Sequence, residues 1–141
     1  MQRGRRIAFD YGDVRIGVAV SDPDSILATP LVTLRSDDKN LTKEIAKIFS
    51  EIEPVAVYVG RPALLSGQDG AATEKALHFV ELLRGLIQIP IELIDERMST
   101  VSAARQLREA GRSAKSSRDF IDMAAAVAIL EFALEIEKGK K

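Results

Sequence analysis

The sequence predicts a single α/β domain, residues 1–141, built on a mixed sheet of five strands, three antiparallel and then two parallel, flanked by helices. Strand-like segments follow one another closely from residue 6 to residue 34, which leaves no room for crossover helices and favours antiparallel pairing. After residue 40, helix-like and strand-like segments alternate. This alternation is typical of parallel strands joined by helices that cover the sheet.

The expected elements are strands at 6–11, 15–21 and 29–34, a helix from about 40 to 53, a strand at 55–59, a helix at 73–87, a strand at 91–94, a short helix at about 100–110 and a helix from about 117 to 137. Gly12 and Asp13 form the turn between the first two strands. Pro54 ends the first helix, Pro90 returns the chain to a strand, and Ser117 is a candidate cap of the last helix. Ribonuclease H-like domains have this order of elements.

The composition excludes several kinds of active site. The chain contains no cysteine, so disulfides, thiolate metal sites and cysteine nucleophiles are ruled out. The single histidine, His78, argues against a Ser-His-Asp triad and against a metal site built from several histidines. No apolar run approaches the ~18 residues of a membrane span, and no signal peptide precedes the first strand. We therefore expect a cytoplasmic protein with no membrane partner.

Asp10 is the first candidate catalytic residue. In the strand 6–11, side-chain alternation puts Ile7 and Phe9 on one face of the sheet. Ala8 and Asp10 then lie on the other face. Because helices are expected to cover both faces, a carboxylate at this position needs a partner. The alternative interpretation is an aspartate that caps the turn of the hairpin.

Asp122 is the second candidate. In the last helix it heads an otherwise apolar stripe that continues through Ala125, Ala126 and Ile129, so it is expected to face the sheet. A lone buried carboxylate costs several kcal/mol unless a cation or a hydrogen-bond network compensates. The compensating group is either a metal ion or, in the alternative interpretation, an arginine in a salt bridge.

The end of the last strand supplies a third candidate. Asp95 and Glu96 are adjacent and point to opposite faces of a strand, so only one of them joins the other acids. The alternative is a negative charge at the start of the following helix. A site made only of carboxylates suits Mg²⁺ or Mn²⁺, and two such ions support phosphodiester cleavage.

Five motifs, in order along nearly the whole chain, resemble the YqgF/RuvX family: FDYG at 9–12, RIGVAVSD at 15–22, VGRP at 59–62, DERMST at 95–100 and DMAAAVAIL at 122–130. That family has a ribonuclease H-like fold, was first described as Holliday junction resolvases, and is now usually treated as a nuclease for the 5′ end of pre-16S rRNA. The resemblance implies a nuclease that depends on Mg²⁺ or Mn²⁺. It assigns the catalytic and metal-binding roles to Asp10, Glu96 and Asp122, with Asp95 as the alternative third acid. Arg61 is a departure, because the family usually has leucine there, beside the loop and the substrate groove.

The net charge of −1 hides an uneven distribution. The segment 97–118 carries six cationic residues against Glu109 alone, a net charge of +5. Its candidate nucleic-acid-binding residues are Arg97, Arg112, Lys115 and Arg118. The alternative interpretation of this segment is a solvated helix face. The expected partner is pre-rRNA or branched DNA, and both a monomer and a homodimer remain open.

Two other classes of function compete with a nuclease. Actin-like and sugar-kinase ATPases share the Asp-x-Gly hairpin, but they enclose a nucleotide between two domains, and 141 residues supply one. In a non-catalytic RNA-binding module for ribosome assembly, the acids would only stabilise the fold. Aromatic residues make up 5% of the chain and none is tryptophan, which disfavours a base-stacking platform. Mg²⁺-dependent cleavage, as opposed to simple binding, distinguishes these classes.

Overall fold

The computed structural model describes residues 2–61, 70–95 and 115–139. Its strands are β1 (Arg6–Tyr11), β2 (Arg15–Ser21), β3 (Ala28–Arg35), β4 (Ala56–Arg61) and β5 (Ile91–Asp95). Its helices are α1 (Leu41–Ile52), α2 (Ala71–Arg84) and α4 (Lys115–Gly139). Within these ranges, none of the helices combines the length and the apolar character that crossing a membrane requires.

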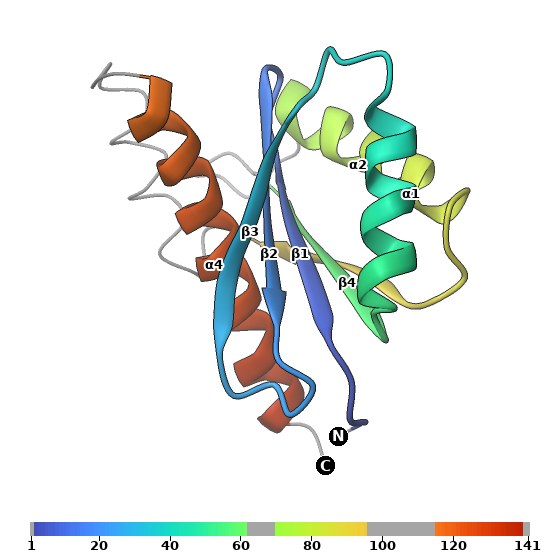
Figure 1. Cartoon of the computed structure of the whole chain (residues 1–141), viewed down its shortest axis with the longest axis vertical. Coiled ribbons are helices and arrows are strands. Elements are labelled where there is room, and N and C mark those ends of the chain that lie inside the picture. Colours follow the sequence, from blue (N-terminus) through green and yellow to red (C-terminus); the bar gives the residue numbers. More distant parts are fainter. Residues whose placement is uncertain (1, 62–69, 96–114, 140–141) are drawn as a thin grey trace.

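The strands form one mixed sheet in the order β3-β2-β1-β4-β5, with β1 at its centre (Figure 1). β2 pairs antiparallel with both β1 and β3, whereas β4 pairs parallel with both β1 and β5. The predicted mixed sheet, three antiparallel strands followed by two parallel ones, is therefore confirmed. Parallel pairing puts the carboxyl ends of β1, β4 and β5 at the same edge of the sheet.

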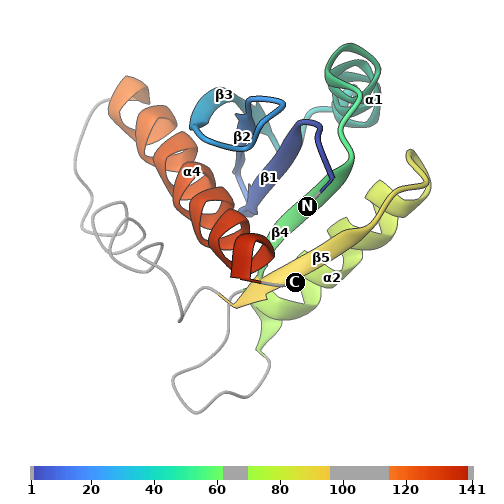
Figure 2. The ribbon, with the colours of Figure 1, turned by 90° about the horizontal axis from the view of Figure 1, so that it is seen from below.

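Helices cover both faces of the sheet, α4 on one side and α1 with α2 on the other (Figures 1 and 2). The α4 face is packed mainly with small residues: Ala8, Ala19, Ala28 and Ala56 of the sheet against Ala125, Ala126 and Ala133 of α4. The opposite face is packed with larger side chains: Ile7, Phe9, Ile16, Val57 and Val59 against Ile45, Phe49, Val80 and Leu83. The strand alternation expected for β1 is confirmed, and the small residues let α4 lie close to the sheet.

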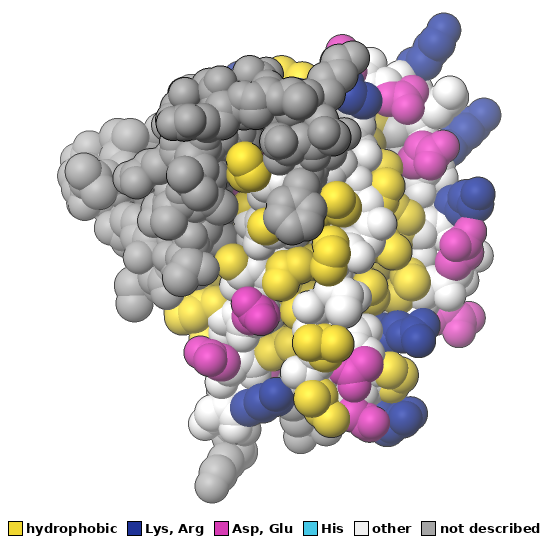
Figure 3. Space-filling view, turned by 60° about the vertical axis from the view of Figure 1, so that its left-hand side comes forward, with side chains coloured by type: hydrophobic (Ala, Val, Ile, Leu, Met, Phe, Trp, Pro, Cys, Tyr) yellow, Lys and Arg dark blue, Asp and Glu magenta, His cyan; other side chains and the backbone are white. Residues whose placement is uncertain are grey.

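β3 forms one edge of the sheet, and the loop before it is partly apolar at the surface. Ile26 and Leu27 in this loop and Leu31 in β3 have exposed side chains. Asp22 closes the loop, because its carboxylate accepts hydrogen bonds from the backbone N–H groups of Ile26 and Leu27. On the side of the molecule that carries β3 and α4, hydrophobic side chains gather centrally and most charged ones lie toward the margins (Figure 3).

The boundaries of several elements differ from the sequence-based expectation. α2 ends at Arg84 and not at residue 87, because the backbone N–H of Gly85 caps it by bonding the carbonyls of Glu81 and Leu82. β3 extends one residue further at each end, to Ala28 and Arg35. α4 already includes residues 115 and 116, so residue 117 lies within the helix and does not cap it. The expected helix at about 100–110 lies outside the described residues.

Candidate active site

Asp10 lies in the central strand on the face that α4 covers. Its side chain follows Ala8 in the alternation of β1, and only 2% of the residue is exposed. Its cross-strand partner in β2 is Gly17. A residue directly opposite on an antiparallel pair shares the same face of the sheet, so the space above Gly17 is adjacent to the Asp10 carboxylate.

Asp122 of α4 occupies the space above Gly17. A Cβ atom built on Gly17 would overlap the backbone carbonyl of Asp122, so glycine is required here by close approach of the helix and not by backbone conformation. Asp122 itself is 1% exposed. The structure therefore brings Asp10 and Asp122 to the same glycine, one from the central strand and one from the last helix.

Arg15 of β2 forms an ion pair with Asp122. Its Nε atom donates a hydrogen bond to Oδ2 of Asp122 at 2.8 Å. The structure therefore contains the salt bridge to an arginine, which was one of the predicted ways to compensate the buried charge of Asp122. Arg15 is not among the site residues predicted from the sequence. Strand alternation was the available signal, because Arg15 and Gly17 are two residues apart and share the α4 face.

The third acid is only partly described. Asp95 is the last residue of β5, and Glu96 lies outside the described residues. Ile94 packs in the cluster on the α4 side, so alternation turns Asp95 to the opposite face, away from Asp10. Arg61 at the end of β4 is in register with Asp95 and shares its face. The arginine that departs from the family pattern therefore stands beside an acid on the side of the sheet away from Asp10.

The predicted basic segment lies mostly outside the described residues. Arg97 and Arg112 fall in the part that the structure does not describe, whereas Lys115 and Arg118 belong to the first two turns of α4. They precede Asp122 in the same helix, by seven and four residues respectively. The direction of α4 thus puts these two positions before the candidate site, at the end of the sheet where β2 begins.

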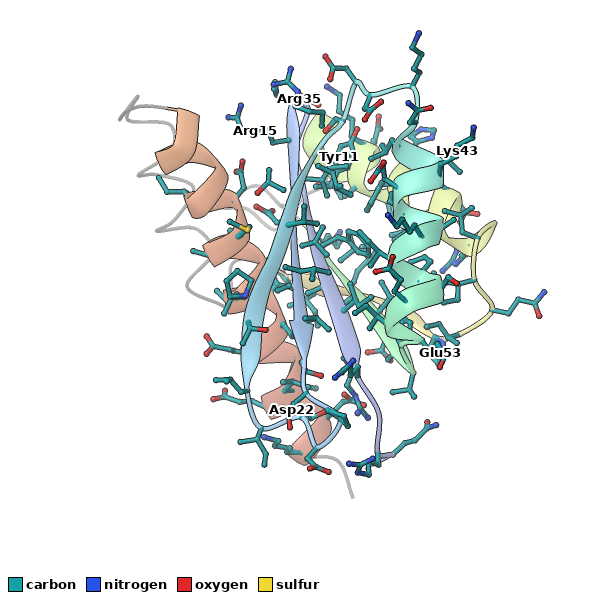
Figure 4. The ribbon with its side chains drawn as sticks, in the orientation of Figure 1. Tyr11, Arg15, Asp22, Arg35, Lys43 and Glu53 are labelled. Carbon is teal, nitrogen blue, oxygen red and sulfur yellow. The ribbon has the colours of Figure 1, made fainter. Side chains whose placement is uncertain are left out.

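Asp22, the acid that ends the second motif, lies far from this site. It is found at the other end of β2, whereas Arg15 and Arg35 lie together at the first end (Figure 4). The backbone N–H of Leu27, and then those of Ile26 and Asp24, hold the pKa of Asp22 below its ordinary value. Its role is to close the loop before β3.

The donor chemistry of the site fits a hard divalent cation. Two buried aspartates from different elements lie at one glycine, and the carboxylate of one of them, Asp122, binds a cationic side chain. Oxygen ligands of this kind suit Mg²⁺ and Mn²⁺. Among the residues that the structure describes, no group of three or more His, Asp or Glu side chains is placed to hold a metal ion. Glu96, the third acid expected for such a group, lies outside the described residues.

The arrangement of strands and helices is that of a ribonuclease H-like domain. Among solved structures, the chain is similar to Thermus thermophilus RuvC in complex with Holliday junction substrate, with a TM-score of 0.55, 17% sequence identity and 96% of each chain covered. At this identity the likeness concerns the fold.

Within that class, the chain belongs to the RuvX family. The model of this family, described as Holliday junction resolvase, matches residues 4–136. A relative from Streptomyces coelicolor is 47% identical over 140 residues, covering 98% of this chain and 84% of its own length. A relative from Rhodococcus opacus is 51% identical over 135 residues, covering 92% of this chain and 76% of its own length. Both carry the name "Putative pre-16S rRNA nuclease".

Proposed function

We propose that this protein is a cytoplasmic nuclease that uses Mg²⁺ or Mn²⁺ to hydrolyse a phosphodiester bond at the 5′ end of pre-16S rRNA. The observation that carries the proposal is the meeting of Asp10 and Asp122 at Gly17. The names of the relatives support the substrate, and membership of the RuvX family supports the reaction class.

Asp10, Asp122 and Glu96 are the residues proposed to hold the metal. Glu96 is proposed over Asp95 because Asp95 lies on the face of the sheet away from Asp10. When bound, divalent ions activate a water molecule and stabilise the leaving oxygen in phosphodiester cleavage. The chain's own contribution is to fix its carboxylates on a central strand and on a helix seated against it.

The segment 97–118 is proposed to hold the nucleic-acid backbone. Lys115 and Arg118 stand in α4 ahead of Asp122, and the cations of this segment would bring phosphates toward the acids. Phosphate contacts position the polymer but do not select its sequence.

The proposal is tested by cleavage of an end-labelled RNA that carries the 5′ precursor of 16S rRNA. Asp10→Asn and Asp122→Asn should each reduce cleavage by about 100-fold or more, because each removes a charged metal ligand. The matched control is Asp24→Asn. Asp24 also pairs with an arginine, Arg3, at 2.8 Å, but it is exposed and lies in the loop after β2. Unchanged cleavage in the two buried variants would overturn the assignment of these acids as metal ligands. Binding of the RNA by the unmodified protein without Mg²⁺-dependent cleavage would favour the non-catalytic RNA-binding module.

Junction resolution is the second candidate, favoured by the description of the family model. The same carboxylates would serve either backbone, so substrate choice must be measured directly. Side-by-side reactions on the precursor RNA and on a four-way DNA junction settle it. Cleavage of the RNA with no cutting of the junction supports the proposal, and the reverse result overturns its substrate assignment.

A further inference from the structure

Arg15 is a partly exposed residue that forms an ion pair with a buried acid. Its Nε atom lies 2.8 Å from Oδ2 of Asp122, whose side chain is 2% exposed. The side chain of Arg15 is itself 19% exposed, so it is accessible to a molecule that binds at this end of the sheet. A charged pair with one accessible member can exchange its partner without unfolding the surrounding structure.

A second arginine stands directly beside it. Arg35 of β3 is the cross-strand partner of Arg15 in the β2–β3 pair, and both lie at the same end of the sheet (Figure 4). Like charges directly opposite each other on neighbouring strands destabilise a sheet. Here each guanidinium faces an acid, Arg15 with Asp122 and Arg35 with the exposed Asp37 at 3.4 Å. A phosphate bound by both arginines would also relieve this repulsion.

We propose that Arg15 couples metal binding to nucleic-acid binding, serving as the counter-ion of Asp122 in the free protein and as a ligand of a backbone phosphate in the complex. This proposal rests on the proposed function, because it takes Asp122 as a metal ligand. A guanidinium and a divalent cation repel each other and compete for one carboxylate. A phosphate offers the guanidinium a partner of matching bidentate geometry, and a long, flexible side chain is enough to make the exchange.

The coupling is reciprocal. A phosphate that draws Arg15 away from Asp122 raises the affinity of this carboxylate for the metal. By linkage, the metal raises the affinity for nucleic acid by the same factor. The free protein then binds the metal weakly, and the site is completed when nucleic acid arrives.

The experiment is a calorimetric titration of Mn²⁺ into the protein, with and without a single-stranded RNA that gel electrophoresis shows to remain uncut under the conditions of the titration. Without RNA, Arg15→Gln should bind Mn²⁺ at least about fivefold more tightly than the unmodified protein, at the lower end of usual coupling factors. The RNA should raise the Mn²⁺ affinity of the unmodified protein toward that of the variant, and should change the variant much less. Arg15→Lys keeps a cation and should keep the coupling.

Arg3→Gln is the matched control, because Arg3 pairs with Asp24 through the same Nε–carboxylate geometry at the surface. It should leave both titrations unchanged. If Arg15→Gln binds Mn²⁺ no more tightly than the unmodified protein, the coupling role is overturned while the nuclease proposal stands. If none of these proteins binds Mn²⁺, the metal role of Asp122 fails, and the coupling fails with it. Melting temperatures over a Mn²⁺ series give the same comparison if the metal-free variant is too unstable for calorimetry.

Discussion

The backbone carbonyl of Asp122 lies so close to the Cα atom of Gly17 that no side chain fits between them. Gly17 is also the cross-strand partner of Asp10. One contact between the last helix and the second strand therefore sets how near the two buried acids approach each other. The geometry of the candidate site and the packing of α4 on the sheet depend on the same residue.

Gly17→Ala is expected to lower the free energy of unfolding by about 3 kcal/mol, at the upper end of the usual cost of overpacking. The added methyl group meets backbone atoms, which cannot rotate away, so α4 must shift outward. Urea denaturation measures the change. Cleavage of the precursor RNA should fall in the same variant, because the shift separates Asp122 from Asp10.

Gly139→Ala is the control for this substitution. Nothing lies within 4 Å of a Cβ atom built on Gly139, at the end of α4. Alanine has a higher helix propensity, so this variant should be equal to the unmodified protein or more stable by up to about 1 kcal/mol. Equal stability of the two alanine variants would show that the approach of α4 to Gly17 is looser than described.

Asp122→Asn is expected to destabilise the metal-free protein. The substitution leaves the guanidinium of Arg15 without its negative partner in a largely buried pair, although an amide oxygen can still accept its hydrogen bond. We expect a loss of about 2 kcal/mol, below the full cost of breaking a buried pair. Asp24→Asn, which breaks the exposed pair with Arg3, should change stability by no more than about 0.5 kcal/mol.

Asp10→Asn distinguishes repulsion between the two acids from the attraction between Asp122 and Arg15. Two carboxylates that meet at one glycine repel each other when no metal is bound. Neutralising Asp10 should therefore leave the metal-free protein equally stable or more stable, in contrast to Asp122→Asn. Denaturation curves in the presence of a chelator provide the comparison. A large loss of stability in Asp10→Asn would indicate that Asp10 serves mainly to hold the fold.

Tyr58 should make the stability of the protein depend on alkaline pH. Burial, and then the hydrogen bond that its hydroxyl donates to Glu137, raise the pKa of Tyr58 well above its ordinary value. The folded state therefore keeps a proton that the unfolded chain loses. This contribution to stability is complete below about pH 10 and is lost as the pH rises further, by up to about 1.4 kcal/mol per pH unit.

Tyr58→Phe should remove this part of the alkaline loss, and unfolding curves measured between pH 8 and about pH 11 would show it. Tyr11→Phe is the matched control, since Tyr11 is the only other tyrosine of the chain and its ring packs against Phe79 at 5.0 Å. It should retain the pH dependence of the unmodified protein. Parallel alkaline curves for all three proteins would contradict the prediction.

The basic segment should control the salt dependence of nucleic-acid binding. Replacing Arg112, Lys115 and Arg118 together by glutamine is expected to weaken binding to all sequences alike. The slope of log affinity against log salt concentration should fall by about two to three units, because each phosphate contact contributes ~0.7–0.9. Fluorescence anisotropy at several salt concentrations measures the slope.

The control for this variant removes the same number of charges elsewhere. Lys39, Lys43 and Lys47 are exposed at the start of α1 and along it, on the face of the sheet away from α4. Their replacement should leave the slope nearly unchanged. Equal slopes for the segment variant and the unmodified protein would identify the segment as a solvated face.

Local rules were enough to predict much of the fold and one part of the site. Alternation in β1 placed Ile7 and Phe9 opposite Ala8 and Asp10, and the structure has this arrangement. The apolar stripe after Asp122 likewise predicted that this acid faces the sheet, and it is buried. These predictions depend only on neighbours within one element, whose periodicity is visible in the sequence.

Rules that use only neighbouring positions in the sequence could not predict which residues pair with the buried charges. Arg15 and Asp122 are 107 residues apart, and spacing within a strand gives the face of Arg15 but not the residue it meets. Arg6 of β1 is 1% exposed and binds Glu137 of α4 at 2.8 Å, a partner 131 residues away. The face of Asp95 likewise depends on which face of the packed sheet Ile94 occupies. Each of these answers needs the tertiary packing of α4.

The separation of 107 positions between Arg15 and Asp122 has a consequence for synthesis of the protein. All five strands leave the ribosome before α4 does, and domains begin to form while the chain is still being made. Until α4 has been made, Asp10 has neither the helix that covers it nor Asp122 beside it. The two acids meet only after residues 115–139 have emerged and docked, so a polypeptide still short of that helix lacks the complete site that we propose for RNA cleavage.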